Sequence, residues 1–154
     1  MHELHHSASH FNATISYRHF WAEALIKLAF LYPLVGVIFR APPGVGTAVA
    51  LVFALNHQVA HMNLRFEPRF KCLVNHPQYH RLHHSNASRD ANINFADLFP
   101  MWDFIFGTMR RPAPSEWVDV GLHDDRAPKT VLQGILWPWY RKRQSATAPF
   151  PDTT

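Results

Sequence analysis

Eight of the twelve histidines fall into three tight clusters, and these clusters constrain the fold more than any other feature of the chain. Their spacings are H-x-x-H-H, H-x-x-x-H and H-x-x-H-H again. Residues three and four apart share one face of an α-helix, so each cluster can direct its imidazoles at one point. The eight residues are His2, His5, His6, His57, His61, His80, His83 and His84.

Neutral imidazole is the commonest protein ligand for transition metals, and four such ligands satisfy one tetrahedral ion. Eight therefore suffice for two ions with coordination positions left open for chemistry. Chance would be an adequate explanation for a lone H-x-x-x-H pair, but not for that pair together with two H-x-x-H-H copies in 154 residues. We therefore predict that all eight histidines bind metal.

The other four histidines are open to simpler interpretations. His76 precedes a proline, which suits the first turn of a helix, so His76 is expected at the cap and outside the helical face. His123 lies in a polar stretch among aspartates and is expected to be exposed. For His10 and His19 the sequence favours neither a structural nor a functional role.

Composition restricts the remaining classes of function. The single cysteine, Cys72, excludes an internal disulfide and a thiolate metal cluster, so any metal is held by nitrogen, and the sequence leaves open whether oxygen also takes part. The net charge of +4 is modest and accompanies no recognised motif, so no nucleic-acid partner is expected. The length fits one domain, predicted over residues 1–144, followed by a disordered tail over residues 145–154.

Two apolar segments, residues 20–39 and 45–55, flank a Pro- and Gly-rich turn signal at residues 40–46. Twenty residues of helix span about 30 Å, which is the thickness of the hydrocarbon core of a bilayer. The pattern predicts a helical hairpin within the membrane, and a hairpin buried in a soluble protein is the alternative.

Charge predicts how such a hairpin would be oriented. Twelve of the fifteen lysines and arginines follow His61, so the long C-terminal part is expected on the cytoplasmic side. The first residues lack the apolar stretch of a secretory signal. The hairpin returns the chain to the side that it left, so the three histidine clusters can meet there. We therefore expect an all-α, integral, multi-pass membrane protein with a cytoplasmic, histidine-rich helical cap.

Residues 130–143 combine apolar and aromatic side chains with a terminal Arg-Lys-Arg. Aromatic residues beside a basic cluster suit a membrane interface. An ordinary segment that docks on the rest of the protein fits the composition equally well, and the sequence leaves both interpretations open.

The order of the motifs resembles that of the fatty acid hydroxylase and sterol desaturase superfamily over roughly residues 2–140. The resemblance is carried by the first H-x-x-H-H-S, Asn12, Arg18-His19, Glu23, the H-x-x-x-H pair, the second H-x-x-H-H-S, Asn94-Phe-Ala96 and Trp102-Asp-Phe-Ile-Phe-Gly-Thr108. The second histidine box together with the W-D-F-I-F-G-T stretch is its most specific part. Members of this superfamily are membrane di-iron enzymes that use O₂ on lipid substrates.

The resemblance implies two iron ions, which zinc can replace in a structure, and O₂ as the co-substrate. It implies a sterol, fatty acyl or alkylglycerol substrate whose C–H bond is hydroxylated or desaturated. Electrons must come from an external donor, because the sequence has no dinucleotide fingerprint and no iron–sulfur or haem motif. The family also carries an upstream histidine pair that this sequence lacks, so we expect an N-terminally truncated chain with an incomplete site.

Metal-bound imidazoles are oriented by groups that accept their other ring proton. Four residues are candidates for this role, and the two that match family positions, Asn94 and Asp103, are favoured. The full candidate set is Asp90, Asn94, Asp97 and Asp103.

Two alternatives compete with the oxygenase. His2-Glu3-x-x-His6 reads H-E-x-x-H, the zinc metallohydrolase pattern in which Glu3 would be the general base. The second box carries Arg81 in place of that glutamate, so the feature that both boxes share is the histidine pattern and not the acid. The other alternative is an inactive membrane remnant that binds metal.

Overall fold

The computed structural model describes residues 2–65, 73–90, 92–122, 124 and 126–147, and every named element in these ranges is a helix, with no strand among them. One isolated antiparallel bridge joins Ser85 to Val120. The predicted all-α class is therefore confirmed. The predictions for Cys72 and His123 fall on positions outside the described residues.

The first apolar segment forms one long helix from Trp21 to Phe39. It consists of α2 (Trp21–Ile26), the π-helical η2 (Lys27–Leu31) and α3 (Tyr32–Phe39). Pro33 lies just after the π-helical turn and has no N–H to donate to the preceding turn. Widened turns and prolines are the usual sites where a helix departs from α geometry, so their coincidence here is expected.

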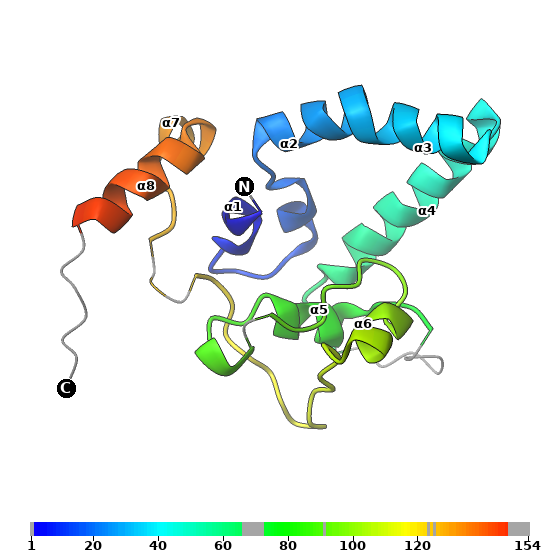
Figure 1. The fold of residues 1–154 in the computed structure, drawn as a ribbon. Helices are drawn as coiled ribbons and strands as arrows, with labels where there is room; N and C mark the ends of the chain where they lie inside the picture. The colour runs from blue at the N-terminus through cyan, green and yellow to red at the C-terminus, as the bar shows by residue number, and fades with distance from the viewer. Residues whose placement is uncertain (1, 66–72, 91, 123, 125, 148–154) are drawn as a thin grey trace.

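The chain reverses more tightly than the sequence predicts. Arg40 adopts a left-handed conformation (φ 48°, ψ 35°), and α4 (Pro43–Ala60) begins three residues later. The predicted turn at residues 40–46 is therefore too long, because a proline is well suited to the first turn of a helix. From this turn α4 runs back towards the rest of the molecule, where it packs on α5 and η1 (Figure 1).

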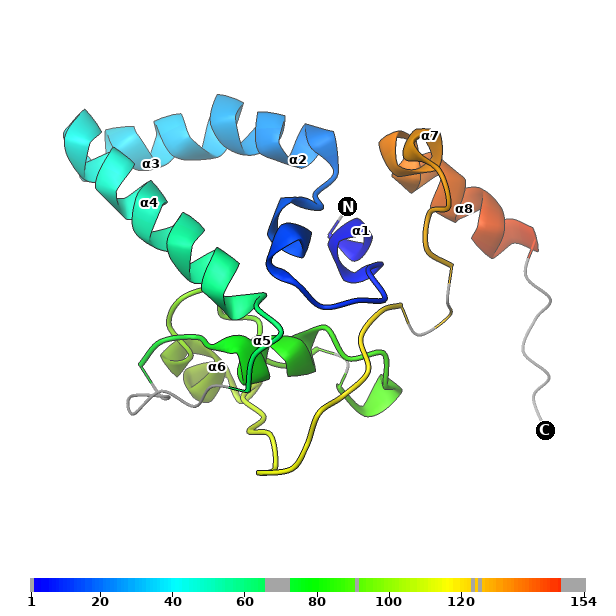
Figure 2. The ribbon, with the colours of Figure 1, turned by 180° about the vertical axis from the view of Figure 1, so that it is seen from behind.

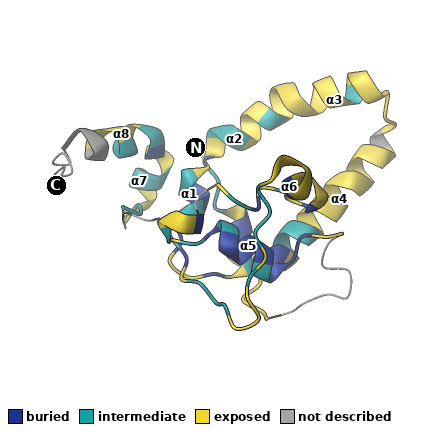
Figure 3. Ribbon diagram, turned by 60° about the horizontal axis from the view of Figure 1, so that its bottom comes forward, coloured by how far each residue is buried: buried dark blue, intermediate teal, exposed yellow. Residues whose placement is uncertain are grey.

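Apolar side chains cover the outside of these helices, and both helices are predominantly exposed (Figure 3). Among the described residues, the helix from Trp21 to Phe39 is the one long and apolar enough to cross a membrane. The apolar part of α4, Gly44–Ala60, is shorter. Within the described ranges, no other segment covers either helix along most of its length (Figure 2).

Two small clusters of buried residues hold the N-terminal segment in place. In α1 (Glu3–His6), Leu4 packs against Phe20 and Trp137. The Asn12 side chain caps η1 (Ala13–Tyr17) by accepting a hydrogen bond from the Thr14 N–H at 2.9 Å. The second cluster contains Ala8, Phe11, Ile15 and Val120.

The second histidine box lies on α5 (Pro77–His83), and His76 occupies the N-cap position, as predicted. The chain then passes through η3 (Ser88–Asp90) to α6 (Met101–Phe106). Gly107 ends α6 with a φ of 71°, a left-handed conformation that favours glycine.

Residues 131–147 form α7 (Val131–Ile135) and α8 (Trp137–Thr147). Trp137 is buried against Leu4 and Phe20, so the segment docks on the rest of the protein. Val131 and Trp139 of the same segment remain exposed. Helix α8 extends three residues into the predicted tail. Residues 148–154 are not among those described, so the disordered tail stays a prediction.

Candidate metal centre

The three histidine clusters come together at the C-terminal end of α4. The first box lies on and just before α1, the pair on the last turn of α4, and the second box on α5 (Figure 1). Ring centroids are 4.8 Å apart for His5 and His61, and 4.2 Å apart for His61 and His80. Residues separated by more than fifty positions in the sequence therefore share one site.

Four imidazoles form what we call the buried group: His5, His61, His80 and His84. Each offers one ring nitrogen, and these nitrogens all lie within 4.8 Å of one another. All four side chains are buried. Four nitrogen donors around one point match the ligand number of a tetrahedral transition-metal ion.

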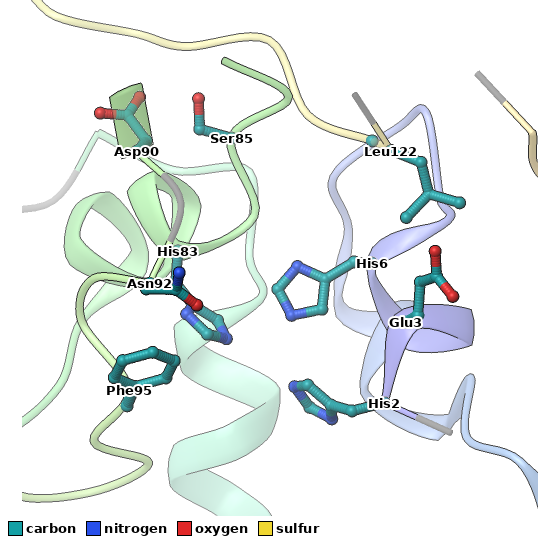
Figure 4. A pocket seen from close by; sticks show the side chains of 10 residues that line it. His2, Glu3, His6, His83, Ser85, Asp90, Asn92, Phe95 and Leu122 are labelled. Carbon is teal, nitrogen blue, oxygen red and sulfur yellow. The ribbon is translucent and has the colours of Figure 1, made fainter. Parts of the chain in front are cut away.

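Three further imidazoles form what we call the outer group: His2, His6 and His83. Their ligand nitrogens also lie within 4.8 Å of one another. In Figure 4 the His2 and His6 rings on one side of a pocket point towards His83 on the other side. His2 is exposed and the other two are half-buried, so this group lies nearer to solvent than the buried group.

His57, the eighth predicted ligand, lies beside the buried group. Its ring centroid is 4.5 Å from that of His61. Its Nδ1 is 3.0 Å from a carboxylate oxygen of Asp97, and its Nε2 is buried without a hydrogen-bond partner in the part of the chain that the structure describes. A carboxylate that holds one ring nitrogen while the other stays free is the arrangement that orients a metal-binding histidine.

Hydrogen bonds to backbone carbonyls assign the tautomers of three histidines. The Nδ1–H groups donate to carbonyl oxygens, from His5 to Ile15 at 3.1 Å, from His61 to His57 at 2.7 Å, and from His83 to Ile93 at 2.9 Å. A carbonyl oxygen can only accept, so in a neutral imidazole Nε2 is left with a lone pair. Each of these rings therefore presents an acceptor nitrogen to the site.

The ring nitrogens of the buried group are arranged more favourably for a bound cation than for contact with one another. The Nε2 atoms of His61 and His5 lie 2.9 Å apart, although both are acceptors in the tautomers assigned above. The Nε2 of His80 is also 2.9 Å from that of His61. Because two lone pairs at this distance repel each other, a metal ion that accepts both relieves the conflict. The donor set and its tautomers thus fit a transition metal.

Burial keeps these imidazoles neutral. Desolvation, reinforced by neighbouring histidines, lowers the pKa of His6 to about 3, and desolvation lowers the pKa of His61 to about 4. The pKa values of His5, His80 and His84 are lowered as well, with burial as the largest cause. Because a histidine binds metal only without its second proton, the site is ready to bind metal at neutral pH.

The two favoured orienting residues support a loop. Asp103 accepts hydrogen bonds from the backbone N–H groups of Phe95 and Ala96, at 2.8 and 2.9 Å. Asn94 bonds the backbone of Tyr79 and Arg110. Both residues thus fix the path of the chain beside α5. Among the four candidates, Asp97 is the one whose described hydrogen bond reaches a histidine ring.

Asp90, the remaining candidate, is buried and pairs with arginines. Its carboxylate lies 3.3 Å from Arg110 and 3.8 Å from Arg89. These ion pairs indicate a structural role for Asp90, although Asp90 also lines the pocket beside the outer group (Figure 4).

Two residues that are part of the family resemblance, but were not predicted as ligands, lie within the site. His19 and Glu23 form a third potential metal-binding group with His2. The His19 ring also stacks on His5, with centroids 4.8 Å apart and planes 7° from parallel. A signal was present in the sequence: a histidine and an acid at i and i+4, where an apolar helix begins.

Glu3 does not have the surroundings of a hydrolytic base. Its carboxylate accepts a hydrogen bond from Arg141 on α8 at 2.7 Å, and Arg141 also binds Asp124. In Figure 4 this carboxylate points away from His2 and His6. A carboxylate that is held by a guanidinium and turned away from the imidazoles is not placed to serve as the base, so the zinc hydrolase alternative is not favoured.

A cavity of about 390 Å³ opens beside the outer group. Histidines of this group form part of its wall, and Phe95 and Leu122 supply apolar surface (Figure 4). The volume falls in the range of small-molecule sites. A substrate segment placed here would lie directly against the outer group.

The sequence matches one protein family and several curated proteins. A family model described as fatty acid hydroxylase matches residues 1–108. Alkylglycerol monooxygenase from Xenopus tropicalis is 31% identical over 110 residues, and alkylglycerol monooxygenase from Homo sapiens is 32% identical over 124 residues. These matches cover 70% and 79% of the chain.

The chain spans about a quarter of the length of these curated relatives, 24% and 26% respectively. No solved structure gives a significant match. The family model covers well over half of the chain, including all three histidine clusters and the W-D-F-I-F-G-T stretch. The chain therefore belongs to the fatty acid hydroxylase family, as its histidine boxes indicated.

Proposed function

We propose that this chain carries the metal centre of an O₂-dependent lipid oxidoreductase with two iron ions. The observation that carries the proposal is the buried group, four neutral imidazoles within 4.8 Å of one another, next to the three imidazoles of the outer group. One ion would be held by each group, with His57 beside the first. Iron supplies the redox chemistry with O₂ that no amino-acid side chain provides.

The protein's own residues would position and protect this centre. Backbone carbonyls of Ile15, His57 and Ile93 fix three imidazole rings in the tautomer that offers Nε2. Asp97 would do the same for His57. Burial excludes water from the first group, whereas the pocket beside the outer group lets a substrate approach from one side.

An alkylglycerol is the first substrate to test, because two of the similar proteins are named alkylglycerol monooxygenases. A sterol and a fatty acyl chain are the other members of the class. Hydroxylation is favoured over desaturation, since a monooxygenase inserts one oxygen atom. Electrons would come from an external donor.

We further propose that α2, α3 and α4 form a hairpin in the bilayer, with the histidine centre in a cap on the cytoplasmic side. Exposed apolar side chains along both helices support the insertion. The excess of lysine and arginine after His61 supports the orientation.

The test is metal analysis and turnover of the full chain purified in detergent. About two irons per chain, and O₂-dependent oxidation of an alkylglycerol with a chemical or enzymatic electron donor, would support the proposal. His84→Ala should lower the iron content and abolish turnover, whereas His10→Ala should change neither, because His10 is exposed.

Other results would overturn the proposal in distinguishable ways. One zinc per chain with hydrolysis that Glu3→Gln abolishes would support the metallohydrolase. Bound metal without turnover on any of the three lipid classes would support an inactive metal-binding remnant.

A further inference from the structure

A third group of potential ligands lies where α2 begins. The Nδ1 of His19 and the Oε2 of Glu23 are 3.9 Å apart, and both atoms are buried without a hydrogen-bond partner among the described residues. His2, His19 and Glu23 each offer one ligand atom, and these three atoms all lie within 4.8 Å of one another. A separation of 3.9 Å is too long for a hydrogen bond, so two polar atoms face the same space unsatisfied.

The other carboxylate oxygen of Glu23 is accounted for. Oε1 accepts a hydrogen bond from the Lys27 ammonium at 2.8 Å, one helical turn away. The ion pair therefore explains why Glu23 is tolerated at the start of an apolar helix. It leaves unexplained why the second oxygen points at histidines.

His19 is part of the same imidazole assembly. Besides stacking on His5, its ring centroid lies 5.8 Å from that of His57. A residue merely placed at a helix start would not have its ring beside those of two histidines of the centre. Two histidines and one carboxylate that leave coordination positions open form a ligand set suited to Fe(II) and related divalent ions.

We propose that His2, His19 and Glu23 form a third metal position, which binds a first-row divalent ion through two imidazoles and one carboxylate. The inference rests on the proposed two-metal centre, because His2 also belongs to the outer group. To serve both ions at once, its imidazole would give up its ring proton and bridge them through its two nitrogens. It adds a carboxylate to a ligand set that the sequence predicts to be all imidazole.

Lys27 makes the proposal sharply testable. If Glu23 serves only the ion pair, then Glu23→Gln and Lys27→Met remove the same interaction and should have the same effect. If Glu23 binds metal, the Lys27 ammonium competes with the ion for the carboxylate. Lys27→Met should then strengthen metal binding, whereas Glu23→Gln should weaken it.

The experiment is a Co²⁺ titration of the full chain in detergent, followed by equilibrium dialysis with metal analysis and by the visible ligand-field spectrum of the bound ion. In Glu23→Gln we expect one Co²⁺ fewer per chain, or binding at that position weakened by at least about tenfold, the lower range for a damaged metal site. His19→Gln should reproduce this loss. Glu116→Gln is the matched control, because this carboxylate also pairs with a cation, Arg110, away from the histidines.

Unchanged Co²⁺ stoichiometry and affinity in Glu23→Gln would overturn the inference, as would weakened binding in Lys27→Met. His84→Ala separates this failure from that of the proposed function. If His84→Ala loses Co²⁺ while Glu23→Gln does not, the buried group stands and the third position is rejected. If the wild-type chain binds no Co²⁺, both proposals fail.

Discussion

The histidine centre and the apolar helices invert the usual distribution of polar and apolar side chains. His5 and His61 are fully buried, at 0% exposure, whereas Phe30 and Val37 on the helix from Trp21 to Phe39 are 71% and 75% exposed. In a soluble domain, contiguous apolar surface of this extent marks an interaction site. Exposed apolar helices of this kind are normal in a protein whose helices are surrounded by lipid. Their exposure is therefore compatible with a stable fold.

Burying the imidazoles of the histidine centre carries a free-energy cost. Neutral imidazoles can be buried only if their N–H groups are bonded, and backbone carbonyls supply that partner for His5, His61 and His83. Their remaining lone pairs are crowded together, as the 2.9 Å separation of the His5 and His61 Nε2 atoms shows. The centre is therefore expected to be sensitive to protons and to metal, and the helices to neither.

The largest expected effect is a decrease in the free energy of unfolding of the metal-free protein in weak acid. The folded protein holds the pKa of His6 at about 3 and that of His61 at about 4, below the ordinary value of 6.5. The unfolded chain then binds more protons than the folded one, so stability is full above about pH 6.5 and falls as the pH drops towards 4. Each such histidine contributes roughly 1.4 kcal/mol per pH unit in this window.

Urea unfolding of chelator-treated protein at pH 7.5, 6.5 and 5.5 measures this effect. The free energy of unfolding should decrease by several kcal/mol between pH 7.5 and 5.5, and His61→Gln should reduce the slope. His10→Ala should leave the slope unchanged. A flat profile would mean that the imidazoles are not held neutral by burial.

Metal should stabilise the centre by about 4 kcal/mol when its concentration is roughly 1,000 times the dissociation constant, because it binds the folded state. The expected result is a higher unfolding temperature for the cap on addition of Fe²⁺ or Zn²⁺, and a smaller shift in His61→Ala, in which the outer group can still bind its ion. Thermal unfolding followed by circular dichroism measures it. An equal shift in His61→Ala would place the metal away from the buried group.

Local spacing predicted the histidine faces, because three- and four-residue periodicity fixes which side chains share a side of a helix. It also predicted His76 at the N-cap of α5. The path of the irregular segment after His84 was beyond such reasoning. Asn94 and Asp103 were therefore favoured over Asp97, although Asp97 is the residue whose carboxylate reaches a histidine ring.

The apolar pattern likewise gave the helices but not their details. It did not predict the π-helical turn before Pro33 or the short reversal at Arg40, since both depend on single residues within a uniform stretch. Nor did it place Glu23 at the centre, because an acid at the start of an apolar helix is equally well explained by its pairing with Lys27. Whether residues 130–143 dock or lie at an interface was left open, and Trp137 shows that docking is part of the answer.

A single charged substitution tests whether lipid surrounds the exposed apolar helix. Phe30 lies near the middle of the helix from Trp21 to Phe39, and Phe30→Arg would cost almost nothing in water, where the side chain is already exposed. At the centre of a bilayer an arginine costs about 3 kcal/mol, roughly a hundredfold in the insertion equilibrium. Membrane fractionation after expression measures the inserted share.

Tyr17→Arg is the matched control for that variant. Tyr17 is 79% exposed and lies outside the apolar helix, so its replacement should leave insertion unchanged. Equal insertion of both variants would show that water, and not lipid, surrounds the helix.

The smallest expected effect concerns His57, which lies in the last turn of α4 at the edge of the histidine centre. Asp97→Ala removes the carboxylate 3.0 Å from the His57 Nδ1 and frees that ring to rotate. Loss of such a partner typically weakens metal binding by about 10- to 100-fold, or roughly 1.4 to 2.7 kcal/mol. Competition with a chelator of known affinity measures the change. Asp119→Ala, an exposed aspartate whose charge acts on Arg81, should have no effect. If both variants bind metal as the wild type does, His57 is a neighbour of the centre and not one of its ligands, and the buried group alone holds the first ion.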